Sequence, residues 1–528
     1  MRLFPTRPAL DLALAAASVV LVGILLFQPA IVAWGGALMT GLALARAITL
    51  LNVARVRTAG FEMVWRNGGR SARVAKGQTL ELFAEVRNRD TRAVRFAASR
   101  VVASSNVAIE VTPAAGEVPA GGRLELSVKV RGKRVGRQGL FGLGLEMRGS
   151  TGLFEVPLTF ANAFGIEVLP AATPSRRAAL RIAAAAVGAR PSRRSGDSSE
   201  FSEIRDHQFG DPLKRVAWKA SARRGKLMVR KYETEEREIV WLVLDASVEL
   251  WAGRVGAAPL DLAIDCAAEL ARQHLRAGHE VGLELVTGEG VTKVAASRGT
   301  GQEQRLFEAL LRAPTTLEPG RSGLDERGIA QRVLEHLVAS TPSLAARVPV
   351  GHLDAIAALA REQLEQAPFA DAQIHAASAR ESLLRSYLAA FGVSGPPRLE
   401  PERPRTDVVL AEAIAAHVSN RVNSLVYVLS PLPDATRLAL LGPALRRSRR
   451  SRTQLRWLHA TELPALEPAQ DVSGELARTA ARLRAETERR AAELGLRRIG
   501  IASSLCVPAD AALAREMAGT DPKGDRAA

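Results

Sequence analysis

The 528-residue chain is poor in cysteine and in aromatic side chains, and it has no motif for nucleotide hydrolysis. Its two cysteines, Cys266 and Cys506, stand far apart and outside any metal-binding spacing, which favours a reducing compartment. Without a Gly-rich phosphate loop, the chain is not expected to hydrolyse ATP. Aromatic residues make up 4% of the chain, and no recognition motif accompanies them, so nucleic-acid binding is not favoured.

Charged residues are missing from Leu12 to Ala45, a stretch too long for a single membrane helix of about 20 residues. The pair Gln28-Pro29 lies near its middle, and proline breaks the interior of a helix. We therefore expect a two-helix membrane hairpin over residues 1–57, with helices at about 12–27 and 31–51. A cleaved signal peptide is the alternative, but it leaves the second apolar segment unexplained.

The charges around this hairpin predict its orientation. The connection between the two apolar segments is uncharged, whereas both outer ends carry arginines, namely Arg2, Arg7, Arg46, Arg55 and Arg57. The positive-inside rule places both outer ends in the cytoplasm. We therefore expect a multi-pass protein of the inner (cytoplasmic) membrane whose large body lies in the cytoplasm.

Residues 58–172 alternate between apolar and polar side chains in short runs separated by Gly- and Pro-containing turns. The clearest runs are residues 80–87 and 124–130. Period-2 alternation of this kind is typical of an antiparallel β-sandwich. We find no catalytic constellation in these runs, which favours a spacing or docking role for the domain.

Residues 173–235 contain a linker and then a motif segment, GD-x3-R-x2-W-x2-SAR, which ends at Arg223. Asp211 followed by Pro212 is typical of a helix start, with an N-cap and a proline at the first helical position. We expect a short helix from Pro212, anchored to the domain core by Trp218. We also expect a charge network of Arg205, Asp206, Arg215 and Arg223.

Residues 236–518 contain short apolar runs that alternate with segments whose apolar residues have the spacing of a helix. The run 239–244 has six consecutive apolar residues, as in a strand buried on both faces. A helix at 260–277 and further strands at 281–286, 425–429 and 454–458 predict a mostly parallel sheet with helices on both faces. A helical insertion is expected at about 301–404. The tail 519–528 is expected to be disordered.

The motif segment resembles the domain of unknown function 58 family at Arg205, Gly210, Asp211, Arg215, Trp218, Ser221 and Arg223. The resemblance is close over about 165–265, and the wider layout of hairpin, sandwich and α/β domain also fits. It implies that the C-terminal part resembles a von Willebrand factor type A domain. It further implies a MoxR-type AAA+ ATPase as partner, often beside a transglutaminase-like membrane protein. No particular reaction is implied.

The resemblance to type A domains also implies a divalent-cation site. Asp245, Ser247 and Thr406 match its pattern, and such oxygen ligands suit Mg2+ or Ca2+. However, Glu249 replaces a serine of the pattern, and Pro431 stands where an aspartate is expected. We therefore expect weak cation binding or none. In the alternative interpretation, Asp245 caps neighbouring loop amides.

These patterns together favour a membrane-anchored, cytoplasm-facing adaptor or scaffold rather than an enzyme. It would work with the ATPase in the assembly or maturation of protein complexes. One alternative is an envelope-related enzyme that uses Asp245, Glu249 and the Arg/Asp cluster near Asp211. Another is a binder of anionic lipid or nucleic acid through the arginine runs at 190–194 and 446–452.

Overall fold

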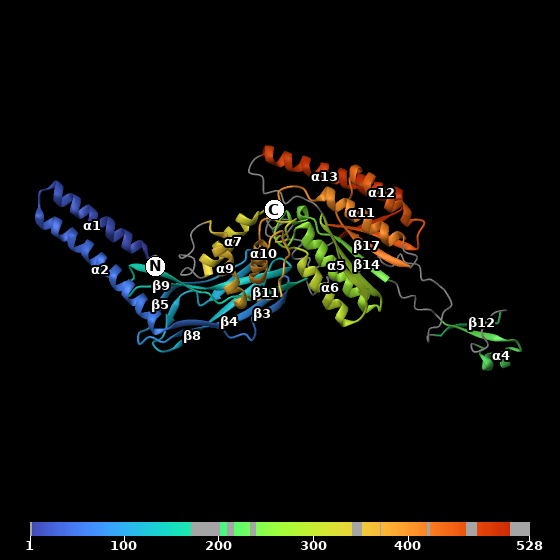
Figure 1. Cartoon of the computed structure of the whole chain (residues 1–528), viewed down its shortest axis with the longest axis horizontal. Coiled ribbons are helices and arrows are strands. Elements are labelled where there is room, and N and C mark those ends of the chain that lie inside the picture. The colour runs from blue at the N-terminus through green and yellow to red at the C-terminus, as the bar shows by residue number, and fades with distance from the viewer. Residues whose placement is uncertain are drawn as a thin grey trace, which may run out of the picture.

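The computed structural model describes residues 3–170, 201–208, 216–232, 239–340, 351–369, 371–419, 423–460 and 472–506. These residues form a helical hairpin, a β-sandwich, a small β-α-β unit, an α/β domain and a helical insertion (Figure 1). The C-terminal tail predicted to be disordered lies outside the described residues.

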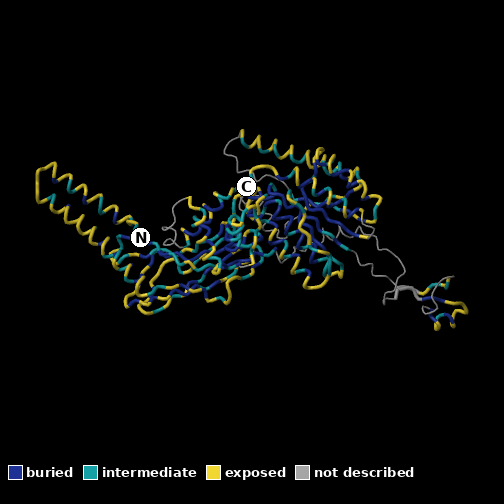
Figure 2. The backbone as a smooth tube through the Cα atoms, in the orientation of Figure 1, coloured by how far each residue is buried: buried dark blue, intermediate teal, exposed yellow. Residues whose placement is uncertain are grey.

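The hairpin consists of α1 (Arg7–Leu25) and α2 (Pro29–Ala59), which confirms the predicted break at Gln28-Pro29. Pro29 takes the first helical position, where its missing N–H removes no helical hydrogen bond. Both helices are long and apolar enough to cross a membrane, and most of their residues are exposed (Figure 2). Beyond the predicted end at residue 51, α2 continues and packs Val53 and Val56 against the sandwich.

Two β-sheets confirm the sandwich. One sheet contains β1 (Phe4–Pro5), β10 (Phe154–Phe160), β9 (Gly136–Arg148), β11 (Phe164–Leu169), β3 (Ser71–Ala75), β5 (Val94–Ala103) and β7 (Gly116–Val118). The other contains β2 (Phe61–Trp65), β4 (Thr79–Asn88), β8 (Arg123–Gly132) and β6 (Val107–Thr112). Alternate side chains of β4 and β8, such as Leu82 and Leu126, are fully buried in a shared core. The pairing is antiparallel except between β11 and β3.

The motif segment forms a small unit of its own. It contains β12 (Phe201–Asp206), α4 (Trp218–Arg224) and β13 (Met228–Tyr232), and the two strands pair antiparallel. Gly225 ends α4 in the left-handed conformation (φ 68°), which glycine adopts without strain. The predicted helix start at Pro212 lies outside the described residues.

The α/β domain is built on a six-stranded sheet of order β16-β15-β14-β17-β18-β19. Its strands are β14 (Ile239–Asp245), β15 (Glu280–Thr287), β16 (Gly290–Ser297), β17 (Ser424–Leu429), β18 (Thr453–Ala460) and β19 (Ala502–Cys506). All neighbours are parallel except β15 and β16. The four inner strands were predicted from the sequence and the two edge strands were not. Nearly all residues of these edge strands are exposed or only partly buried.

Helices cover both faces of this sheet. One face carries α5 (Pro259–Arg276) and α6 (Thr300–Arg312), and the other carries α11 (Arg403–Ser419), α12 (Ala435–Ser448) and α13 (Val472–Ile499). Leu242 of β14 packs into the first core, and the adjacent Val243 packs into the second, as alternation along a strand requires. Cys266 and Cys506 are both buried in the first core.

The insertion consists of α7 (Glu326–Ser340), α9 (Leu353–Gln363), the 3-10 turn η3 (Leu364–Gln366) and α10 (Ala379–Phe391). These helices share a hydrophobic core with Phe141 of β9, so the insertion packs on the sandwich. The predicted start of the insertion at residue 301 is wrong. Leu306 and Leu310 of α6 are fully buried in the core of the sheet, so α6 belongs to the α/β domain.

Candidate functional site

The central strands β14 and β17 define the candidate site. From β14 the chain continues to β15 on one side, and from β17 it continues to β18 on the other, so the strand order switches between them. Open α/β sheets bind ligands beyond the carboxyl ends of their strands at such a point. A cavity of about 530 Å³ lies there, lined by Glu249, Pro401, Arg403, Pro404, Asp407, Asp434, Thr436, Arg437 and Leu440. We call it the switch-point groove.

Asp245, the last residue of β14, is completely buried beside this groove. Its Oδ1 accepts hydrogen bonds from the backbone N–H of Ser247 at 3.1 Å and from the Ser247 hydroxyl at 2.7 Å. Its Oδ2 accepts from the Ser430 hydroxyl at 2.7 Å. From the sequence, Ser430-Pro431 stands where an aspartate was expected, and the spacing assigned no role to the Ser430 hydroxyl. These contacts match the interpretation in which Asp245 caps its own loop.

Arg437 of α12 supplies positive charge at the same place. Its Nε donates to Asp407 Oδ2 at 2.8 Å and its Nη2 to Asp407 Oδ1 at 2.6 Å, and both side chains are at least nine-tenths buried. Its Nη1 donates to the Pro431 carbonyl at 3.0 Å, and its Nη2 also donates to the Ser430 hydroxyl. The Arg437 Nη2 lies 3.8 Å from Asp245 Oδ2, and so does Nη1 of Arg403.

These residues do not fit a bound Mg2+ or Ca2+. Both oxygens of Asp245 already accept hydroxyl hydrogens, and two guanidinium groups approach its Oδ2. A divalent cation would be repelled by these guanidinium charges. The third predicted ligand, Thr406, is fully buried, but its hydroxyl donates to the Glu402 carbonyl at 3.2 Å. Arg437 thus provides the positive charge that an ion would otherwise supply.

Two glutamates join the loops around the groove. The buried Glu402 accepts from the backbone N–H of Val248 at 2.8 Å and from that of Gly288 at 2.7 Å. The Oε1 atom of Glu249 accepts from the backbone N–H of Arg403 at 2.6 Å, which joins Glu249 to the start of α11. The sequence analysis missed Glu402 because it lies in a Pro-rich stretch that resembles an exposed loop.

Arg321 is a further buried charged residue near Asp245 and Glu402. Its side chain donates to the carbonyls of Ala313, at 3.1 Å, and Ala246. Burial lowers the pKa of Arg321, while the nearby Glu402, Glu318 and Asp245 oppose that change. Burial likewise raises the pKa of Glu318. Sequence spacing gave no signal for the approach of Arg321 to Glu402 and Asp245, because these residues come from separate segments.

The motif segment holds one prediction that the structure overturns. Trp218 does not anchor α4, because its side chain is 65% exposed. The unit is held instead by Ser221, whose hydroxyl donates to the Ala217 carbonyl at 3.0 Å and accepts from the Met228 N–H at 2.8 Å. Seven residues of helix beside two strands offer too little apolar surface to cover an indole.

The structure describes only part of the predicted charge network, because Arg215 lies outside the described residues. Asp206 pairs with Lys226 at 2.7 Å, and Arg205 donates to the Asp206 carbonyl at 2.9 Å. Arg223 is exposed at the end of α4. The remaining predicted residues, Gly210, Asp211 and Arg215, lie outside the described residues.

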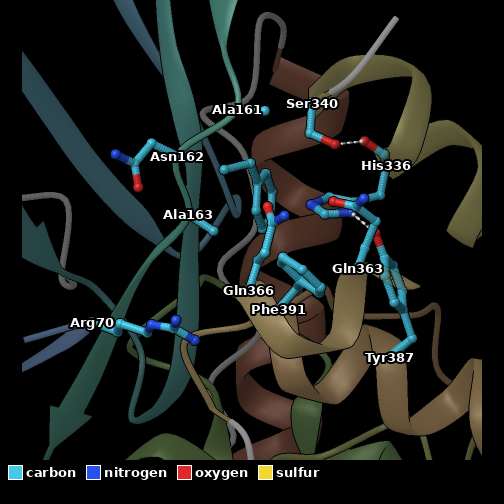
Figure 3. Close-up of a pocket in the computed structure, with 11 residues that line it drawn as sticks. Arg70, Ala161, Asn162, Ala163, His336, Ser340, Gln363, Gln366, Tyr387 and Phe391 are labelled. Atoms are coloured by element: carbon cyan, nitrogen blue, oxygen red, sulfur yellow. Dashed lines mark hydrogen bonds between the residues drawn. The ribbon is translucent and has the colours of Figure 1, made fainter. Parts of the chain in front are cut away.

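A second cavity, of about 190 Å³, lies between the sandwich and the insertion (Figure 3). Its lining includes Arg70 and Asn162 from the sandwich side and His336 and Tyr387 from the helices. The Tyr387 hydroxyl lies 3.0 Å from His336 Nδ1, and burial lowers the pKa of His336 to about 4. Pockets for small molecules usually measure about 300–1,000 Å³. The switch-point groove is therefore the stronger candidate.

The comparisons with known proteins identify part of the chain. The sequence model of the family described as "Protein of unknown function DUF58" matches residues 203–340. The match is confined to residues 203–340, which we call the DUF58 region. This DUF58 region includes the β12-α4-β13 unit except the first two residues of β12, and it also includes Asp245 and Glu249. The opposite wall of the groove, on α11 and α12, lies beyond it.

Curated proteins similar to part of this chain are described as uncharacterized. The uncharacterized proteins Rv1480 of Mycobacterium tuberculosis and Mb1516 of Mycobacterium bovis are each 29% identical to it over 119 residues. The match covers 22% of this chain and 38% of each relative, so the chain spans well under half the length of these relatives.

Solved structures resemble only parts of the chain. The PapD-like domain 7 of human CEP192 is 16% identical, with a TM-score of 0.17, and the match covers 20% of this chain and 85% of that domain. The E. coli chaperone DraB is 11% identical, with a TM-score of 0.15, and covers 33% of this chain and 86% of its own. Likeness at this level carries no argument about function.

Proposed function

We propose that this protein is a membrane-anchored adaptor whose body faces the cytoplasm and binds a MoxR-type AAA+ ATPase. In this proposal the α/β domain is a von Willebrand factor type A-like domain, and its switch-point groove is the surface that recognises the partner. A transglutaminase-like membrane protein would be a further member of the same assembly.

The observation that carries this proposal is that the carboxylates of Asp245 and Asp407 at the groove are already hydrogen-bonded within the protein. Asp245 accepts hydrogen bonds at both oxygens, and Asp407 is held in a two-point pair by Arg437. A catalytic base or nucleophile has to reach a substrate within about 3 Å, and these groups are already bonded to the protein itself. The groove therefore offers a fixed shape with apolar walls, including Pro401, Pro404 and Leu440, which suits recognition.

The hairpin supports the anchored part of the proposal. Most residues of the apolar helices α1 and α2 are exposed. In water they would form an unfavourable apolar patch, whereas in a bilayer the lipid chains would cover them. Arginines at both outer ends favour a cytoplasmic body. An ATPase of the cytoplasm would then reach the groove directly.

The test is the rate of ATP hydrolysis by a purified MoxR-type ATPase, measured with and without the full-length protein in detergent. We expect the protein alone to be inactive and the mixture to hydrolyse ATP faster than the ATPase alone. An unchanged rate together with no measurable binding would rule the proposal out. Turnover of a peptide or envelope substrate by the protein alone would favour the enzyme hypothesis instead.

A further inference from the structure

The exposed tryptophan of the motif segment is unusual for its surroundings. Trp218 is 65% exposed, and two other apolar side chains of the same small unit, Leu227 and Ile204, are 46% and 39% exposed. Large apolar residues exposed together on a small unit mark a contact surface for another molecule. Tryptophan is also among the residues that contribute most to the binding energy at protein interfaces.

The charge of this unit restricts its partner. Residues 201–232 contain nine lysines and arginines against three acidic residues. Lys219, Arg223 and Arg224 lie on α4, the helix that begins at Trp218, and all three are exposed. Two copies of so basic a surface would repel each other, which argues against self-association through this face. The complementary surface is acidic, with an apolar recess for the indole.

The chain on the C-terminal side of the unit limits where the unit can reach. Six residues separate Tyr232, the last residue of β13, from Ile239, the first residue of β14. Six residues and their flanking bonds span at most roughly 25 Å. The unit therefore stays near the amino end of β14, whereas the switch-point groove lies beyond the carboxyl end of that strand.

The same tether argues against a lipid partner. The sandwich separates the α/β domain from the α1–α2 hairpin (Figure 1), so a unit tethered to β14 is held away from any bilayer that contains the hairpin. Binding of single-stranded nucleic acid uses several aromatic side chains on which successive bases stack. Among the side chains whose burial is described in this unit, at residues 204–208 and 216–229, Trp218 is the one exposed tryptophan or tyrosine.

We propose that the β12-α4-β13 unit is a second docking surface, on which Trp218 and the α4 cations bind an acidic protein surface. This assignment rests on the proposed adaptor function and names the same ATPase as the owner of that surface. The DUF58 region includes the whole of α4, so this contact would belong to the part of the chain that defines its family. The adaptor would then hold its partner at two separate places.

The experiment measures the affinity of the MoxR-type ATPase for full-length protein in detergent, with Trp218→Ala, Trp218→Phe and Arg223→Glu as variants. Arg327→Glu is the matched control, because Arg327 is an exposed arginine of the DUF58 region on α7. We expect Trp218→Ala and Arg223→Glu each to weaken binding at least tenfold without changing the melting temperature. Trp218→Phe and Arg327→Glu should bind within about twofold of wild type. Because the contact is ionic, added salt should weaken wild-type binding more than Arg223→Glu binding.

The possible results separate the two proposals. If the wild-type protein binds and both Trp218→Ala and Arg223→Glu bind equally well, the docking assignment is wrong while the adaptor function stands. If the wild-type protein does not bind, the adaptor function is wrong, and the docking assignment falls with it. Variants that keep ATPase binding but lose binding to phosphatidylglycerol vesicles or to an RNA oligonucleotide would also overturn the assignment.

Discussion

Arg437 and Asp407 form a two-point ion pair at the edge of the α/β sheet, with Nε to Oδ2 at 2.8 Å and Nη2 to Oδ1 at 2.6 Å. The pair joins α12 to the start of α11, the two helices that supply one wall of the switch-point groove. The shape of that wall therefore depends on a charge pair from which water is largely excluded.

Breaking this pair should destabilise the protein strongly. Removing one partner leaves a buried charge uncompensated, which typically costs about 3–5 kcal/mol. We expect Arg437→Met to lower the free energy of unfolding by about that amount, measured by chemical denaturation in detergent. The double variant Arg437→Met/Asp407→Leu should recover part of the loss, because it removes both charges. A single variant as stable as wild type would show that the pair is not a structural support.

Divalent cations should not bind at Asp245. The positive charges of Arg437 and Arg403 lie 3.8 Å from its Oδ2, and its oxygens already accept hydroxyl hydrogens. Calorimetric titration of the full-length protein with Mg2+ or Ca2+ should give no saturable heat below the millimolar range. Micromolar binding that disappears in Asp245→Ala would contradict this description of the site.

His336 should make stability depend on pH. Burial lowers its pKa to about 4, whereas an unfolded histidine titrates near 6.5. Between these two pH values His336 is protonated in the unfolded chain and neutral in the folded protein. The contribution of neutral His336 to the free energy of unfolding is therefore complete above about pH 6.5 and is lost as the pH falls to about 4. His336→Asn should flatten the fall in melting temperature over this range. The fall should not vanish, because the pKa of His274 is also lowered to about 4.

Topology provides an independent prediction. The positive-inside rule, applied to the arginines at the outer ends of α1 and α2, predicts that residues from 58 onward lie in the cytoplasm. A reporter that is active only outside the cytoplasm, fused after residue 528, should be silent, and a cytoplasmic reporter at the same position should be active. The opposite pattern would mean that the first apolar segment is a cleaved signal peptide or that the hairpin is inverted.

The sequence was informative wherever one periodic pattern determined an element. Gln28-Pro29 marked the turn of the hairpin, and the apolar run at 239–244 marked the central strand. The failures share a physical cause, because each depended on contacts between distant segments. Three features follow from how separate elements contact one another: the Arg437–Asp407 pair, the hydrogen bonds from two loops to Glu402, and the exposure of Trp218. The local spacing of residues carries no signal for such contacts.

The most direct test of the proposed function is the affinity of the MoxR-type ATPase for full-length protein carrying Leu440→Asp. Leu440 lines the switch-point groove and is 45% exposed, so aspartate there should leave folding intact while placing a charge in an apolar wall. Val291→Asp is the matched control, because Val291 is 41% exposed on the edge strand β16. We predict that Leu440→Asp weakens binding at least tenfold, about 1.4 kcal/mol, and that Val291→Asp leaves it unchanged. Equal affinity of Leu440→Asp and wild type would show that the groove is not the recognition surface.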